Sequence, residues 1–329
     1  MPGTELTRRA LLASAATAPI AGAAGAQTSR STPWPERPVR VIVPYPPAGG
    51  ADTTARIIFA RLSEDFGQQF AIENRGGAGG TIAEAIAAKA DPDGYTILHD
   101  ATAFSVNGAL YENLPFDYGK SFDPVFLVGL VANILVVTPS LPVNTVADVI
   151  AYAKSAPDGI DMASSGNGTL QHLLLELFAR TAGIKINHVP YRGGGEAVKD
   201  VMAGQVKFVF SNGSSVFGLV KSGKVKAIAQ TGKGRLPTLP DIPPMSDTLP
   251  GFEGYDWNGV FVPHGTPSTI VTKLNAGLNA ALVSPQVTAR FTELNVESHQ
   301  NTPQEFGAYI ESQMQLWSRI VKDANIKLG

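Results

Sequence analysis

Apolar residues recur along this chain with two different periods, and the alternation of these periods predicts its secondary structure. Short β-branched runs such as 39–43 are typical of buried strands, whereas 52–66 places Ile58, Leu62 and Phe66 at helical spacing. Strands are predicted at 39–43, 70–73, 95–99, 126–137, 160–163, 186–189, 207–210, 225–231 and 257–262, and helices at 52–66 and 81–90, from 145, from 169, at 196–203 and in the C-terminal part. This alternation indicates an α/β fold.

The order of the predicted elements indicates two lobes that are connected twice. The apolar segment 126–137 is long enough to pass from one lobe to the other, the pattern starts again after Pro139, and 257–262 crosses back. We therefore expect lobe 1 to comprise 35–133 and 254–329, and lobe 2 to comprise 134–253. Such an arrangement is typical of hinged proteins that bind a ligand in the cleft between α/β lobes.

The N-terminus predicts export. Arg8 and Arg9 precede an apolar run at 10–24, and small residues at 24–26 form a cleavage site. This run is shorter than the ~20 residues that a membrane span needs. We expect 1–26 to be a cleaved signal of the twin-arginine type, which places the mature protein in the periplasm. The chain contains no Cys, so neither a disulfide nor a lipid-modified cysteine is expected.

Composition excludes some partners. Charged residues make up 16% of the chain and the formal net charge is −2. This balance provides no basic surface for nucleic acid or for an acidic membrane. The hydrophobic content of 44% permits a large core instead.

Glycine-rich loops between strands and helices are the candidate binding elements. They occur at 41–52, 164–169 and 191–195, and Asp52 is expected to cap the helix that follows the first of them. Unpaired backbone N–H groups at the positive end of a helix dipole suit an anion such as a carboxylate. The loops therefore predict a binding protein for a small acid.

Enzyme motifs are not found. The chain has no G-x-S-x-G sequence, and Gln171 stands where a dinucleotide fingerprint would need its third glycine. The five histidines, at 99, 172, 188, 264 and 299, show no metal-ligand spacing. We expect no catalytic residue, no metal and no cofactor. A secreted α/β hydrolase-like enzyme with an unmarked carboxylate-based site remains the alternative.

From 35 to 322 the chain resembles the Bug-type solute-binding proteins of tripartite tricarboxylate transporters. The resemblance is carried by PYPPAGGAD at 44–52, NRGGAGG at 74–80, DPDGYT at 91–96, ASSGNGT at 163–169, HVPYRGGG at 188–195, AGQV at 203–206, WNGVF at 257–261 and PHGTP at 263–267. It implies a two-domain periplasmic receptor, most similar to type II binding proteins, that closes over an organic acid. It also implies a monomer that hands its ligand to membrane permease subunits and binds no nucleic acid.

The resemblance also implies a set of ligand-binding positions. Carried over residue by residue, these are Tyr45, Pro47, Ala48, Gly50, Gly79, Thr81, Phe104, Asn107, Ser164, Ser165, Gly168, Thr169, His172, Tyr191, Arg192, Ser211 and Asn212. Tyr45 and Ala48 replace a Phe and a Gly that are frequent in the family. Two alternatives stay open: Arg192 is either a cation opposite the acid or a solvated side chain, and Trp257 is either a packing residue or a stacking platform. The sequence does not identify the acid.

Overall fold

A mixed β-sheet forms the framework of the part of the chain that the structure describes, which is residues 34–47 and 49–326 of a computed structural model. The order of the strands is β2-β1-β3-β9-β4-β7-β5-β6, and β8 pairs with β4. The strands are β1 Val39–Val43, β2 Phe70–Asn74, β3 Thr96–Ala101, β4 Phe122–Val137, β5 Ile160–Ser164, β6 Ile186–Pro190, β7 Phe208–Asn212, β8 Lys226–Gln230 and β9 Tyr255–Pro263. β1 is parallel to β2 and β3, and β5 is parallel to β6 and β7.

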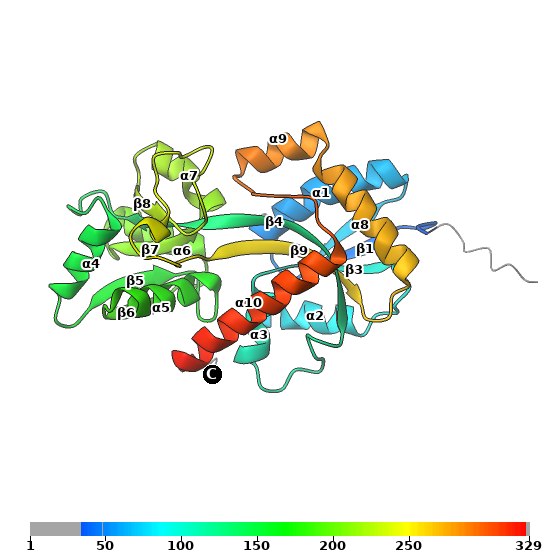
Figure 1. Cartoon of the computed structure of the whole chain (residues 1–329), viewed down its shortest axis with the longest axis horizontal. Coiled ribbons are helices and arrows are strands. Elements are labelled where there is room, and N and C mark those ends of the chain that lie inside the picture. The colour runs from blue at the N-terminus through cyan, green and yellow to red at the C-terminus, as the bar shows by residue number, and fades with distance from the viewer. Residues whose placement is uncertain (1–33, 48, 327–329) are drawn as a thin grey trace, which may run out of the picture. The chain divides into compact units, whose positions relative to one another are not determined.

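Helices cover the sheet on both sides. They are α1 Gly50–Phe66, α2 Thr81–Ala88, α3 Ala103–Leu110, α4 Val146–Lys154, α5 Leu170–Ala182, α6 Gly194–Ala203, α7 Gly213–Lys221, α8 Ser268–Leu282, α9 Pro285–Glu293 and α10 Pro303–Asp323, with short 3₁₀ turns at Ala78–Gly80 and Met245–Asp247. Figure 1 shows α4 to α7 gathered around one end of β4, and α1, α2 and α8 around the other. No helix in the described part of the chain combines the length and the apolar character that crossing a membrane requires.

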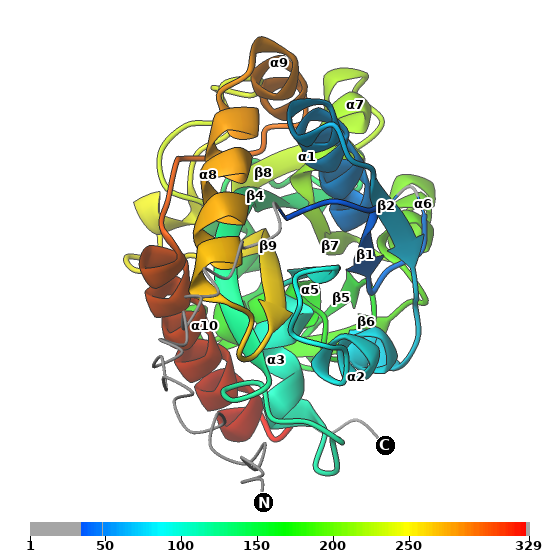
Figure 2. The same ribbon diagram turned by 90° about the vertical axis from the view of Figure 1, so that its right-hand side faces the viewer.

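The strand β4 changes its partners along its length. Its first part, from Phe122 to Ala132, pairs with β9, and its last part, from Asn133 to Val137, pairs with β7 and β8. β4 and β9 run side by side between the two groups of helices (Figures 1 and 2). The change of partners falls at residue 132/133, beside the predicted lobe boundary at 133/134. The division into lobes itself remains a prediction.

The α10 helix contacts two separate apolar clusters. Near its start, Phe306 packs with Trp257, Phe104 and Phe261, and further along Trp317 packs in the cluster around β5 and α5. Phe306 packs directly against the backbone of β9, because a Cβ on Gly259 would lie 2.2 Å from the Phe306 ring. Trp257 has no exposed surface, so the structure favours the packing alternative over a stacking platform.

The alternating pattern predicted most elements, but it missed two helices. Residues 103–110 form α3 and 213–221 form α7, although no helix was predicted at either segment. Both helices are short, have no charged first turn and contain glycine, so neither gives an amphipathic signal that stands out from a loop. Asp52 was also expected to cap the first helix. That expectation was wrong: Gly49 is the N-cap and Asp52 lies inside the first turn.

Candidate functional site

A cavity of about 580 Å³ lies where three glycine-rich segments meet. Its wall combines the starts of α1, α6 and α7, one end of β9, and an apolar side. The lining residues are Tyr45, Pro46, Gly49, Gly50, Ala51, Thr53, Thr54, Ala101, Val131, Ser165, Gln171, Gly194, Gly195, Ser211, Asn212, Ser214, Ser215, Asp256, Asn258, Leu294 and Val296. A larger hollow of about 1150 Å³ lies along α2, α3 and α10, away from these loops.

Three helices begin at the 580 Å³ cavity. Gly49 is the N-cap of α1, Gly193 that of α6 and Asn212 that of α7, where the Asn212 side chain accepts a hydrogen bond from the Ser214 N–H at 3.1 Å. First-turn N–H groups have no acceptor within their own helix. No Lys, Arg or His is found among the described residues that line this cavity. A negative charge bound there is therefore stabilised by N–H groups and helix dipoles.

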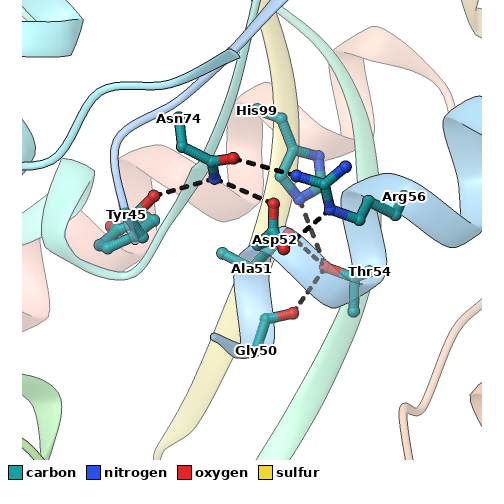
Figure 3. Close-up of polar contacts among 8 residues, drawn as sticks. All are labelled: Tyr45, Gly50, Ala51, Asp52, Thr54, Arg56, Asn74 and His99. Carbon is teal, nitrogen blue, oxygen red and sulfur yellow. Dashed lines mark hydrogen bonds and ion pairs between the residues drawn. The ribbon is translucent and has the colours of Figure 1, made fainter. Parts of the chain in front are cut away.

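Asp52 fixes the start of α1 from within (Figure 3). Its carboxylate is 2% exposed and accepts hydrogen bonds from Arg56 Nε at 2.9 Å and from Asn74 Nδ2 at 2.9 Å. Asn74 Nδ2 also lies 3.0 Å from the Tyr45 carbonyl oxygen. These hydrogen bonds connect the end of β2, the Tyr45 backbone after β1 and the first turn of α1.

Below this turn, Thr54 joins α1 to the strands. Its hydroxyl lies 3.3 Å from His99 Nε2 and 3.2 Å from the Gly50 carbonyl oxygen (Figure 3). It also donates to Asn258 Oδ1 at 3.0 Å. His99 has no exposed surface, and burial lowers its pKa to about 3. The imidazole is therefore neutral at physiological pH and adds no positive charge to the site.

Asp256 is the centre of a polar network that the sequence did not reveal. Its Oδ2 atom accepts hydrogen bonds from Asn133 Nδ2 at 3.2 Å, Gln171 Nε2 at 3.0 Å and Asn212 Nδ2 at 2.8 Å. Ser165 extends the network by donating to Gln171 Oε1 at 2.6 Å. Burial raises the pKa of Asp256, and the three amide donors oppose that rise.

A second buried network reaches the cavity through Tyr45. The Tyr45 hydroxyl donates to Asp100 Oδ1 at 2.9 Å, and Asp100 interacts with Glu84, which also accepts hydrogen bonds from Tyr118 and Asn107. Burial raises the pKa of Asp100 to about 6. Burial and the Asp100 charge raise the pKa of Glu84 well above its usual range, which favours the protonated form of Glu84 beside Asp100.

The structure brings five of the predicted residues to the cavity wall: Tyr45, Gly50, Ser165, Ser211 and Asn212. Several others support the loop before α5 and do not line the cavity. Ser164 is fully buried with its hydroxyl 2.6 Å from His188 Nε2, Thr169 caps α5, and His172 accepts from the Gly168 N–H at 3.1 Å and stacks on His188.

The remaining predicted residues lie elsewhere. Phe104 stacks on Phe261 with ring centroids 4.1 Å apart, because an aromatic side chain on the inner face of α3 belongs to the core. Asn107 donates to the Gly79 carbonyl oxygen at 3.0 Å, and Thr81 lines the larger hollow. Tyr191 donates to Asp200 Oδ2 at 2.7 Å, Arg192 and Pro47 are exposed outside the cavity wall, and Ala48 is outside the described residues.

Other lining residues were missed. Gln171 stands where a dinucleotide fingerprint would need its third glycine, Asn258 lies in the motif WNGVF at 257–261, and Asp256 directly precedes that motif. Polar residues inside a strand that is otherwise apolar were the available signal. Leu294, Val296 and Val131 had no signal, because nothing local distinguishes them from core residues. Among the described residues, no three His, Asp or Glu side chains are grouped closely enough to hold a metal ion.

Comparison with known proteins identifies the class. The family described as "Tripartite tricarboxylate transporter family receptor" matches residues 54–326. The chain belongs to this family of solute-binding receptors, which confirms the resemblance seen in the sequence. It is 34% identical over 316 residues to "Protein BugT" of Bordetella pertussis, with 95% of each chain covered.

Solved structures agree with the fold. An R. palustris protein with adipate is 36% identical, with a TM-score of 0.81 and coverage of 90% of this chain and 100% of the other. MatC from Rhodopseudomonas palustris with bound malate is 32% identical, with a TM-score of 0.77 and coverage of 88% of this chain and 100% of the other. The α/β fold predicted from the sequence is thus that of two-lobed periplasmic solute-binding proteins.

The buried carboxyl pair predicts how stability depends on pH. The folded protein holds the Glu84 proton more tightly than the unfolded chain does, so the free energy of unfolding should fall as pH rises. Above about pH 7.5 His99 is largely neutral in both states, so the decrease that remains there reports the Glu84 proton, at no more than ~1.4 kcal/mol per pH unit, and it ends when the folded protein releases that proton. Urea denaturation should show a shallower decrease for Glu84→Gln. The exposed Glu112→Gln is the matched control, and an equal slope in all three proteins would contradict the assignment.

Proposed function

We propose that this protein is the periplasmic receptor that binds a small organic acid and delivers it to the membrane permease of a tripartite tricarboxylate-type transporter. The observation that carries the proposal is the cavity at which α1, α6 and α7 begin. Relatives with adipate and with malate support a carboxylate as the ligand. We assign the chain no catalytic role.

The carboxylate would bind at the N-terminus of α1, in contact with Gly50. A Cβ on Gly50 would meet no atom within 4 Å, because this position opens into the cavity. The absence of a side chain thus lets a ligand approach the backbone N–H groups of the first turn. Ser165, Gly194 and Ser214 face the same space from the predicted second lobe.

Gly50→Val tests the site directly. The added Cβ would meet no atom within 4 Å, and the side chain would enter the cavity. The dissociation constant of the bound acid should therefore rise at least tenfold, which weakens the binding free energy by about 1.4 kcal/mol. The acid is first identified by thermal-shift screening against mono-, di- and tricarboxylates, amino acids and aromatic acids, and affinity is then measured by calorimetry. Gly218→Ala, on α7 with equally open surroundings, is the control and should bind like the parent. Equal affinity in Gly50→Val would remove this loop from the site.

We further propose that the ligand closes two lobes over itself, with lobe 1 comprising 35–133 and 254–329 and lobe 2 comprising 134–253. Support comes from β4 and β9, which connect the two groups of helices, and from the cavity wall, to which both groups contribute. A ligand that contacts both sides binds the closed form better and so shifts the population toward it. The permease would recognise the closed form.

Small-angle scattering measures this closure. The radius of gyration of the mature parent should decrease when the acid is saturating, whereas Gly50→Val should need at least tenfold more acid for the same decrease. A parent whose scattering curve is unaffected by bound ligand would contradict the closure mechanism while leaving the binding site intact.

Export is proposed from the N-terminal sequence, which lies outside the described residues. We expect Arg8→Lys combined with Arg9→Lys to leave unprocessed precursor in the cytoplasm, because the twin-arginine route requires the arginine pair. Fractionation and immunoblotting of cells that carry the parent and the double variant measure this. Normal processing of the double variant would reject the twin-arginine route, although not export itself.

A further inference from the structure

The only side chain carrying a formal charge in the cavity wall, among the described residues, is that of an acid. Asp256 lines the cavity and keeps part of its surface accessible. A receptor for anions would be expected to place a cation there, but this cavity places the negative Asp256 carboxylate close to the proposed negative ligand. The ligand should therefore carry a group that interacts favourably with this carboxylate.

The surroundings of Asp256 hold it as an acceptor. The amide N–H groups of Asn133, Gln171 and Asn212 all point at Oδ2. Their carbonyl oxygens are engaged elsewhere: Asn133 Oδ1 accepts from Gln171 Nε2 at 2.7 Å, and Asn212 Oδ1 accepts from the Ser214 hydroxyl at 2.6 Å. These contacts fix the direction in which each amide points, so the network favours a carboxylate that accepts hydrogen bonds.

The amides come from separate elements, and this gives Asp256 a defined position. Asn133 is on β4, Gln171 on α5 and Asn212 at the start of α7, while Asp256 lies opposite Val131 in the β4–β9 pair. A side chain held from three directions cannot turn away when a ligand enters. The Asp256 carboxylate therefore offers a fixed acceptor in a cavity whose other polar wall consists largely of N–H and hydroxyl groups.

We propose that Asp256 makes this receptor selective for acids that carry a hydrogen-bond donor, a hydroxyl or an ammonium group, in addition to the carboxylate. The inference rests on the proposed function. The ligand carboxylate binds at the helix N-termini, and its donor binds Asp256. An unsubstituted acid leaves the desolvated carboxylate without that partner, and a site built to pair a donor strongly rejects an analogue that lacks it.

Four matched acids separate this inference from its alternatives. Glutarate has a methylene group at the second carbon, 2-oxoglutarate an acceptor, 2-hydroxyglutarate a donor and glutamate an ammonium group. Propionate, pyruvate, lactate and alanine form the same series with a single carboxylate. Within the series that binds, calorimetry on the mature parent should give at least about tenfold tighter binding for the hydroxy or the amino acid than for the methylene and oxo compounds. The tighter binder of the two shows whether the receptor is selective for hydroxy acids or for amino acids.

The variant Asp256→Asn assigns the preference to this residue. It should reduce the preference for the donor-bearing acid over the unsubstituted acid to less than about threefold. The control is Asp241→Asn, which removes the same charge from an exposed residue outside the cavity wall and should keep the parent's preference. If circular dichroism shows that Asp256→Asn does not fold, the four-acid comparison on the parent decides. A protonated Asp256 would donate to the 2-oxo group and bind the oxo acid well, whereas an Asp256 carboxylate would bind only the hydroxy or amino acid well.

The outcomes distinguish the two proposals. Equal or tighter binding of the methylene or oxo acid in the parent overturns the role of Asp256, as does a folded Asp256→Asn that keeps the full preference. Binding of none of these acids also overturns it, and the wider screen of acids then decides separately whether the receptor function stands. A receptor that binds acids without preferring a donor loses only the inference about Asp256.

Discussion

The hydrogen bonds from three amides to the partly buried Asp256 carboxylate hold the wall of the cavity together. Asp256 is on the strand that connects the two groups of helices, and its donors come from β4, α5 and the start of α7. Removing an ion from water is costly unless donors replace the lost hydration, so the position of each amide is constrained by the others. Ser165 donates a hydrogen bond to Gln171 and Ser214 donates one to Asn212, so the same amides also position these two hydroxyl groups.

Among the described residues, neutral donors, and not cationic side chains, face the cavity. His99 is kept neutral by burial, Arg56 is engaged by Asp52, and the cavity wall presents N–H groups in place of ammonium or guanidinium groups. Backbone donors fixed by helix geometry need no side-chain ordering when a ligand binds, whereas a long cationic side chain would lose rotamer freedom. The glycines at 50, 194 and 195 make this possible, because they leave the N–H groups accessible.

The sequence predicted the alternating strands and helices well, since the periodic apolar runs report local geometry. It also predicted which loops form the cavity, because a glycine-rich connection before a helix has a chemical meaning of its own. It did not separate residues that line the cavity from those that support the loop: Ser164 and Ser165 are neighbours, yet the Ser164 hydroxyl contacts His188 and Ser165 lines the cavity. Asp256, Gln171 and Asn133 are far apart in the chain, and no local pattern reports that they meet. Their meeting depends on strand pairing and helix packing, which are tertiary properties.

The α10 helix has a consequence for how the molecule unfolds. Phe306 belongs to the apolar cluster around Trp257, and Trp317 to the cluster around α5, so a single continuous helix supplies a wall to each. When either cluster unfolds, one end of α10 loses its packing partners, and the remaining cluster is then covered by a helix that is held at one end only. The two clusters therefore cannot melt independently at low cost, and the helix couples them into one cooperative unit even though the strands around them form separate pairings.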